Sequence, residues 1–279
     1  MFRRTLQEWW QCAPRMDRRR GGSERTRQRS RHAGLAHHRR NRRGRLRVHG
    51  HQDLHLALPG KHTEGDGSET LVHGFVSRDE PGWRSLGDWD TLGMRATQSH
   101  TTVLDGAFVP ANRVARVLPV GPNADPFIFA VFANFLPLIA SVYAGLADRA
   151  LELGVEALQQ RSSAISGEAY SEHPDLRWRM ADAALALDAI EPQLHSIVDD
   201  VDGLVDHGAG WFRKLTGVKH RSIETARHVV DQVMRSAGGG AFRSTSELAR
   251  LQRDVLAGIY HPSNPESVYK TVASDLFGN

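Results

Sequence analysis

The chain has 279 residues, 40% of them hydrophobic, which is ordinary for a globular protein and is enough for one large domain or two smaller ones. Its 36 lysines and arginines exceed its 32 aspartates and glutamates, so the formal net charge is +4. The single cysteine, Cys12, excludes an intrachain disulfide and a cysteine-rich zinc site, and this usage is typical of a reducing cytoplasm.

The positive charge is concentrated in the first 50 residues, which hold 16 arginines, no lysine and three acidic residues. An arginine-rich segment can bind the phosphates of a nucleic acid, and its histidines can bind a metal. This segment has no interleaved aromatic residues, no acidic co-ligands and no recognisable ligand spacing. We therefore expect no nucleic-acid partner and no metal site, and we predict that residues 1–60 are a non-native or disordered segment.

Two stretches in the following part of the chain are typical of β-strands. Residues 69–76 (ETLVHGFV) and 101–110 (TTVLDGAFVP) contain β-branched and aromatic residues bounded by Gly, Pro and Asp. Glycine and proline in residues 118–126 (LPVGPNADP) indicate a linker. We expect residues 61–120 to form a partial β-domain.

The remainder of the chain is expected to be helical, because apolar residues recur at the three-and-four spacing of helices that bury one face. The expected helices are 127–161, 173–206, 210–237, 244–258 and 264–276. Long helices with short connections are typical of an antiparallel bundle. The predicted fold is α+β and mostly α, in which residues 121–279 form a C-terminal domain that resembles an antiparallel four-helix bundle.

Residues 127–147 carry no charged side chain and are long enough to cross a bilayer. Asn134 and Pro137 interrupt this stretch, and an amphipathic sequence continues beyond it without a break. We interpret the stretch as a core helix and expect no membrane partner.

Three stretches together resemble the acyl-CoA dehydrogenase superfamily, and they follow the family's order. Residues 74–114 contain a Gly-Met-Arg-x-Thr-x-Ser turn followed by LDGAFVP, as in the second half of the family's β-domain. Residues 143–158 (YAGLADRALELGVEAL) are similar to the first helix of its C-terminal bundle. Residues 233–255 resemble its glycine-pair loop and the helix that ends in Arg-Asp. The resemblance implies an oxidoreductase that binds FAD and assembles as a homodimer or homotetramer.

The family's N-terminal helical domain and the first half of its β-domain have no counterpart in the sequence as written. A one-base shift of the codons for Arg45–Gly60 permits the translation GYVFTGTKIFTSLSP, which resembles the missing pair of strands. An arginine excess without lysine is also what an out-of-frame, GC-rich coding sequence yields. We hypothesise that residues 1–60 are a frameshifted translation. A nucleotide sequence whose other frame does not continue the β-domain would exclude this.

The resemblance implies FAD contacts in the bundle. Gly238 and Gly239 match residues whose backbone approaches the FAD diphosphate or adenine, although a helix C-cap and turn would select glycine equally well. Arg161 lies near the position of an arginine that binds the diphosphate of a neighbouring subunit's FAD. The alternative is an ordinary basic residue at a helix C-terminus.

The polar residues of the Gly-Met-Arg turn also have two possible roles. Arg95, Thr97 and Ser99 can hydrogen-bond the flavin or an acyl thioester, or they can serve the turn in which they lie. The neighbours Arg253 and Asp254 are interpreted as a structural ion pair on a helix.

The expected catalytic carboxylate is missing. In the family a glutamate removes the substrate's α-proton from one of two positions, which correspond here to Pro262, eight residues after Asp254, and to Phe135. His261 is the candidate base, because imidazole titrates near neutrality. Alternatively, the His-Pro pair only starts the last helix. A histidine near this position also resembles the flavin-dependent monooxygenases that share the fold.

The first hypothesis is a cytoplasmic FAD-dependent oxidoreductase that takes a hydride from an acyl-CoA-like small molecule, with activity impaired by truncation. The alternatives are a catalytically inactive helical-bundle fragment or interaction protein, and a flavin-dependent monooxygenase of the same fold. Flavin in the purified protein would contradict the inactive fragment.

Overall fold

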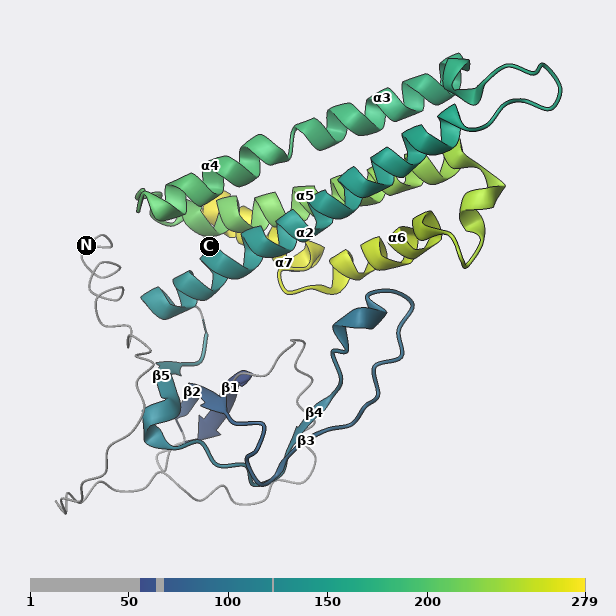
Figure 1. Cartoon of the computed structure of the whole chain (residues 1–279). Coiled ribbons are helices and arrows are strands. Elements are labelled where there is room, and N and C mark those ends of the chain that lie inside the picture. Colours follow the sequence, from purple (N-terminus) through teal and green to yellow (C-terminus); the bar gives the residue numbers. More distant parts are fainter. Residues whose placement is uncertain (1–55, 64–67, 122, 279) are drawn as a thin grey trace, which may run out of the picture. The chain divides into compact units, whose positions relative to one another are not determined.

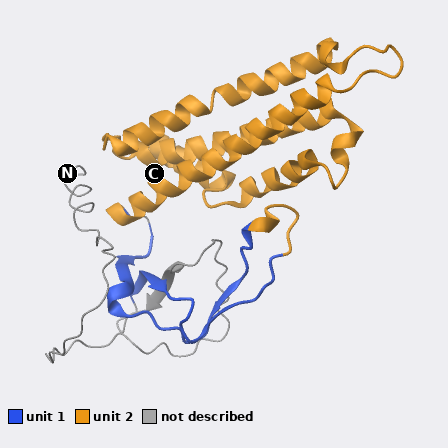
Figure 2. Ribbon diagram, viewed as in Figure 1, with its two compact units in different colours: residues 1, 3–89, 97–123 blue, residues 2, 90–96, 124–279 orange. Residues whose placement is uncertain are grey.

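The computed structural model of the protein describes residues 56–63, 68–121 and 123–278. The chain divides into two compact units, which Figure 2 colours separately. The first holds the described residues up to Trp89 together with Thr97–Asn123, and the second holds Asp90–Ala96 and the described residues from Ala124 onward. Residues 1–55, which carry most of the segment expected to be non-native, lie outside the described residues.

The first unit contains short antiparallel strands. They are β1 (Leu56–Thr63), β2 (Glu69–Val76), β3 (Trp83–Ser85), β4 (Thr102–Leu104) and β5 (Val114–Pro119). β2 lies between β1 and β5 in a three-stranded sheet, and β3 pairs with β4. The strand expected from ETLVHGFV is confirmed as β2.

The structure corrects the boundaries of two segments expected in this unit. β1 begins at Leu56, inside the segment predicted to be disordered, because its backbone pairs along its full length with β2. β4 covers only three residues of the longer strand expected there, because Asp105 and Gly106 turn the chain and Gly106 has a φ of +74°.

The second unit is the helical bundle, drawn from teal to yellow in Figure 1. Its helices are α2 (Pro126–Gln159), α3 (Pro174–Asp188), α4 (Glu191–Asp202), α5 (Gly210–Ala237), α6 (Glu247–Val255) and α7 (Pro265–Phe277). α2 packs along α5, α3 contacts both of them, and α6 and α7 contact α5. The mostly helical α+β fold is confirmed.

The helix expected over residues 173–206 is two helices, α3 and α4, which end and begin around Ala189 and Ile190. Pro192 lies in the first turn of α4. A proline lacks an N–H donor, and its ring clashes with the carbonyl four residues earlier, here that of Asp188. α3 therefore ends at Asp188.

The start of α2 is fixed by its first residues. The Asp125 side chain accepts a hydrogen bond from the Phe127 N–H at 2.8 Å, and Pro126 occupies the first turn, where its missing N–H costs nothing. By length and composition α2 is the one helix among the described residues that is apolar enough to cross a membrane, and 33% of its most apolar window is buried in the protein.

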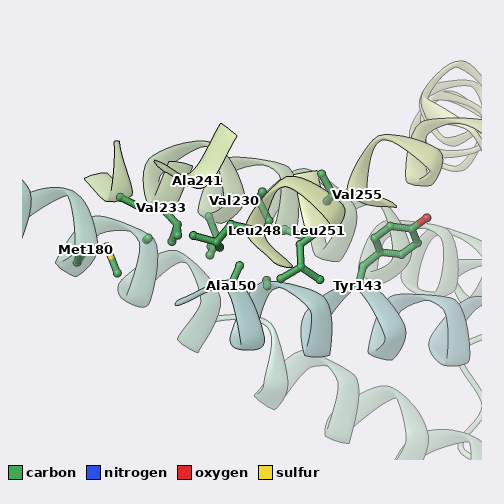
Figure 3. Packing of buried hydrophobic residues seen from close by; sticks show 14 of the residues in the cluster. Tyr143, Ala150, Met180, Val230, Val233, Ala241, Leu248, Leu251 and Val255 are labelled. Carbon is green, nitrogen blue, oxygen red and sulfur yellow. The ribbon is translucent and has the colours of Figure 1, made fainter. Parts of the chain in front are cut away.

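The bundle core consists of small and aliphatic side chains from α2, α3, α5 and α6, with Tyr143 at one end (Figure 3). α2 approaches its neighbours closely at Gly154, where an added Cβ would lie 2.8 Å from the Met180 Cε and 2.9 Å from the Val233 Cγ1. A side chain at position 154 would therefore displace Met180 and Val233.

Candidate functional site

His261 lies in the connection between α6 and α7, directly after the short 3₁₀ turn Leu256–Tyr260. α7 begins at Pro265, and its cap is Asn264, whose side chain accepts from the Ser267 N–H at 3.0 Å. The structure therefore gives the helix-start role to Asn264. His261 is half-buried, and its ring turns toward α2.

The His261 ring meets the hydroxyl of Tyr143, which comes from the middle of α2. The Tyr143 oxygen lies 2.9 Å from the His261 Nε2, and the two rings are edge-to-face at 5.7 Å. Figure 3 shows the Tyr143 hydroxyl oxygen directed away from the aliphatic cluster. Burial, reinforced by the negative charge of Asp254, raises the pKa of Tyr143, so its hydroxyl stays protonated at neutral pH.

Lys219 of α5 reaches the same connection from the other side. Its side chain is 1% exposed, and its Nζ donates to the carbonyl oxygen of Ser263 at 2.9 Å. The His261 and Gly258 carbonyl oxygens lie at 3.4 Å and 3.5 Å. Burial lowers the pKa of Lys219 to about 8, partly opposed by the negative charge of Glu224.

Asp254 anchors a neighbouring loop. Its Oδ1 accepts from the Met94 N–H at 2.6 Å, and an added Cβ on Gly93 would lie 2.1 Å from the Arg253 carbonyl oxygen. The Oδ2 of Asp254 pairs with Arg250 at 3.2 Å. The expected Arg253–Asp254 ion pair is wrong, because adjacent residues on a helix do not face each other, whereas residues four apart do.

A second group forms where α5 ends. Gly238 has a φ of +72°, which favours glycine, and its N–H closes the last turn of α5 on the Met234 carbonyl. The Arg161 guanidinium donates to the Ala237 carbonyl oxygen and lies over the Tyr170 ring at 5.2 Å. The structure thus brings Arg161 next to Ala237 and Gly238, which lie 76 and 77 positions later in the sequence.

This corner suits an anionic group such as a flavin phosphate. Gly239 and Gly240 are exposed, and an added Cβ at either would meet no atom within 4 Å, so the backbone is open to a ligand. At Gly238 an added Cβ would lie 3.3 Å from the Arg161 Nη1. An exposed guanidinium beside a backbone without side chains has the donors that phosphate oxygens require.

The three polar residues of the Gly-Met-Arg turn make local bonds. Arg95 donates to the Asp90 carboxylate and to the Thr91 carbonyl, each at 2.9 Å. The Ser99 hydroxyl lies 3.1 Å from that of Thr97. Turn formation accounts for these contacts, and a flavin or thioester role for Arg95, Thr97 and Ser99 stays a prediction.

Two site residues were missed from the sequence, Tyr143 and Lys219. Tyr143 is the one hydroxylated ring in a long charge-free stretch, and Lys219 falls on the apolar face of α5 marked by Leu215, Ser222 and Ile223. A lysine on a buried helical face is costly unless it is paired, so its position was the available signal. Among the described residues no cluster of three or more His, Cys, Asp or Glu side chains is arranged to hold a metal.

The profile of the acyl-CoA dehydrogenase C-terminal domain matches residues 138–265. Similar proteins include YdbM of Bacillus subtilis, named as an acyl-CoA dehydrogenase, at 27% identity over 203 residues, covering 73% of this chain and 51% of YdbM. The amino sugar nitrososynthase DnmZ of Streptomyces peucetius is 27% identical over 219 residues, 75% of this chain and 52% of DnmZ. HsaA of Rhodococcus jostii, the oxygenase subunit of a flavin-dependent monooxygenase, is 28% identical over 205 residues, which cover 68% of this chain and 54% of HsaA.

Among solved structures, that of KijD3 in complex with FMN and dTDP-3-amino-2,3,6-trideoxy-4-keto-3-methyl-D-glucose has a TM-score of 0.69 at 26% identity, covering 80% of this chain and 55% of KijD3. The helical unit has the fold of the acyl-CoA dehydrogenase C-terminal domain. The match to the acyl-CoA dehydrogenase C-terminal domain covers 128 of the 279 residues, so the chain is similar to that superfamily over its helical unit. It spans about half the length of the curated relatives that it matches.

Proposed function

We propose that the protein is a flavin-dependent oxidoreductase of the monooxygenase type, acting on a small molecule. The observation that carries this proposal is the imidazole of His261, held at 2.9 Å by Tyr143, close to where dehydrogenases of the family use a carboxylate. The two positions that would hold this carboxylate are Pro262 and Phe135. The nitrososynthase and monooxygenase relatives support the same class.

The residues divide into two roles. Arg161, with Gly238 and the exposed backbone of Gly239 beside it, would bind the phosphates of FMN or FAD through charge and N–H donors. His261 would hold or accept the substrate's proton, for which a group that titrates near neutrality is suited. A bound reduced flavin supplies the two electrons with which one atom of O₂ enters the substrate and the other leaves as water.

The acyl-CoA-like substrate of the first sequence hypothesis is the weaker candidate, because its chemistry needs a base strong enough to remove an α-proton. It remains the second candidate on the similarity to YdbM. A cytoplasmic location and a homodimer or homotetramer are part of the proposal. Exposed apolar residues of α2, among them Val131, Leu138 and Val142, support self-association.

The test compares two reactions of the purified full chain. Reduced FMN or FAD is added without oxygen, and binding is measured by fluorescence. Oxygen is then admitted with candidate amino sugars, and oxygenated product is measured by mass spectrometry. Oxygen-dependent product supports the proposal. Reduction of oxidised flavin by an acyl-CoA in the absence of oxygen contradicts it and favours the dehydrogenase, and no binding of either flavin favours the inactive fragment.

A further inference from the structure

The connection that carries His261 lies tightly against α5 and α2. At Gly258 an added Cβ would lie 2.6 Å from the Ile223 Cγ2 and 3.1 Å from the Tyr143 Cε1, so this residue has no room for a side chain. Further along, Ser263 has a φ of +57°, a region that residues other than glycine seldom adopt. A backbone held this closely and in this conformation needs specific bonds to keep it there.

Those bonds come from one ammonium group. An ammonium has three donors, and the carbonyl oxygens of Gly258, His261 and Ser263 lie within 3.5 Å of the Lys219 Nζ. Within the part of the chain that the structure describes, no carboxylate forms an ion pair with Lys219. Burying a charge that has no ion-pair partner is costly, which is typical of functional sites.

We propose that Lys219 is a positioning residue for His261: it binds the three carbonyl oxygens of the connection and thereby holds the imidazole against the Tyr143 hydroxyl. Lys219 acts on the backbone, and Tyr143 acts on the ring. The catalytic use of His261 rests on the proposed function. The contacts of Lys219 and Tyr143 with the connection and the ring do not depend on a bound flavin.

A lysine that only fills space would behave differently. A methionine is apolar and close to lysine in length, and apolar replacement of a buried charge is often neutral or stabilising. If Lys219 only fills space, Lys219→Met leaves the state of the His261 ring unchanged. If Lys219 positions His261, the same substitution frees the connection and the ring moves between tautomers and orientations.

The experiment measures the two ring-nitrogen resonances of His261 by ¹⁵N NMR in the full chain, without flavin. His261→Gln identifies the resonances by their loss. The control Lys214→Met removes a half-exposed lysine of the same helix, which lies 3.8 Å from Asp200. The wild-type protein and this control are expected to show two separate resonances of one fixed neutral form. Lys219→Met and Tyr143→Phe are each expected to show averaged resonances. Two unchanged resonances in Lys219→Met would overturn the proposal.

Turnover gives an independent readout if the enzyme is active. Lys219→Met is expected to lower kcat by about 10- to 100-fold, the usual effect of a misplaced catalytic group, with little change in the Kd for flavin. Absence of monooxygenase activity in the wild-type protein contradicts the proposed function and leaves the NMR result standing. Averaging in the wild-type protein itself contradicts the positioning role, whatever the activity.

The wild-type chain provides the test if Lys219→Met does not fold. With its pKa of about 8, Lys219 loses its charge between about pH 7 and about pH 9, and the His261 resonances should shift with that midpoint. Two neighbouring groups have pKa values displaced away from this range: burial lowers the pKa of His220 and raises that of Tyr143. Resonances that stay constant across this range would overturn the proposal.

Discussion

A buried lysine makes the stability of a protein depend on pH in a direction opposite to that of a salt-bridged lysine. The pKa of Lys219 is about 8 in the folded chain and 10.5 in the unfolded reference. Between these values the unfolded state binds more protons than the folded state, so the free energy of unfolding rises with pH. The cost of burying the charge is fully present below pH 8 and is relieved as pH approaches 10.5.

We therefore expect the free energy of unfolding of the wild-type protein to rise relative to that of Lys219→Met between these two pH values. Denaturant titrations of both proteins at several pH values measure the difference between their free energies of unfolding. Ionisable groups that the two proteins share contribute equally to both values and cancel in this difference. A constant difference across the range would mean that Lys219 has an ordinary pKa in the folded chain.

Arg161 is expected to contribute to flavin affinity. A hydrogen bond from a charged donor is worth about 1.5–3 kcal/mol, so Arg161→Ala should weaken flavin binding by about 10- to 100-fold. Arg177→Ala is the matched control, because Arg177 is an exposed arginine whose nearest carboxylate, Glu172, lies 3.9 Å away. Equal affinities of the two variants for FMN and FAD, measured by fluorescence titration, would remove Arg161 from the site.

The sequence predicted the roles of some site residues but not their contacts. The role of Gly238 as the cap of α5 could be predicted, because glycine after an amphipathic run is a local signal. The contact between Arg161 and that glycine could not, since it depends on how α2 and α5 pack. His261 stood out by its chemistry, but its partners lie 42 and 118 positions earlier in the chain, where no local pattern connects them.

At the scale of helices, two glycines of α2 separate the effect of packing from that of helix propensity. Gly154 has no room for a Cβ, whereas an added Cβ at Gly145 would meet nothing within 4 Å. Alanine is favoured over glycine in a helix by about 1 kcal/mol, so Gly145→Ala should stabilise the protein by up to that amount. Gly154→Ala should instead destabilise it by about 1–3 kcal/mol, because the added carbon displaces Val233.

Thermal or denaturant unfolding of both variants measures these changes. Stabilisation by Gly154→Ala equal to that by Gly145→Ala would mean that α2 and α5 are less closely packed than the structure shows.

The helices were predictable for the most part, because their apolar spacing continues over many turns; α5 matches the expected residues 210–237 at both ends. The break between α3 and α4 was not predicted, although Pro192 is visible in the sequence, because the apolar pattern continues across it. β3 and β5 were missed for a different reason. β3 is only three residues long, and both strands are defined by their pairing with β4 and β2, which a local pattern does not contain.

At the scale of the whole molecule, exposed apolar residues on one side of α2 predict self-association. Val131, Leu138 and Val142 are spaced by seven and four residues, which places them on one face of the helix, and Leu138 is 66% exposed. Leu138→Glu should shift the protein toward the monomer in sedimentation experiments, since a charge on this face opposes its burial.

Ile165→Glu is the control, because Ile165 is fully exposed in a loop outside α2. If Leu138→Glu leaves the association state unchanged while the wild-type protein associates, the interface lies on another surface.

The bond from the Met94 N–H to the Asp254 carboxylate joins residues 160 positions apart in the sequence. Closing so long a loop is entropically costly, so this bond forms only when α6 already has its place against α5. The Met94 amide proton therefore reports whether α6 is in its place in the bundle. Its exchange with deuterated solvent should be slow while the bundle is intact and should accelerate as soon as α6 detaches, before the longer helices unfold.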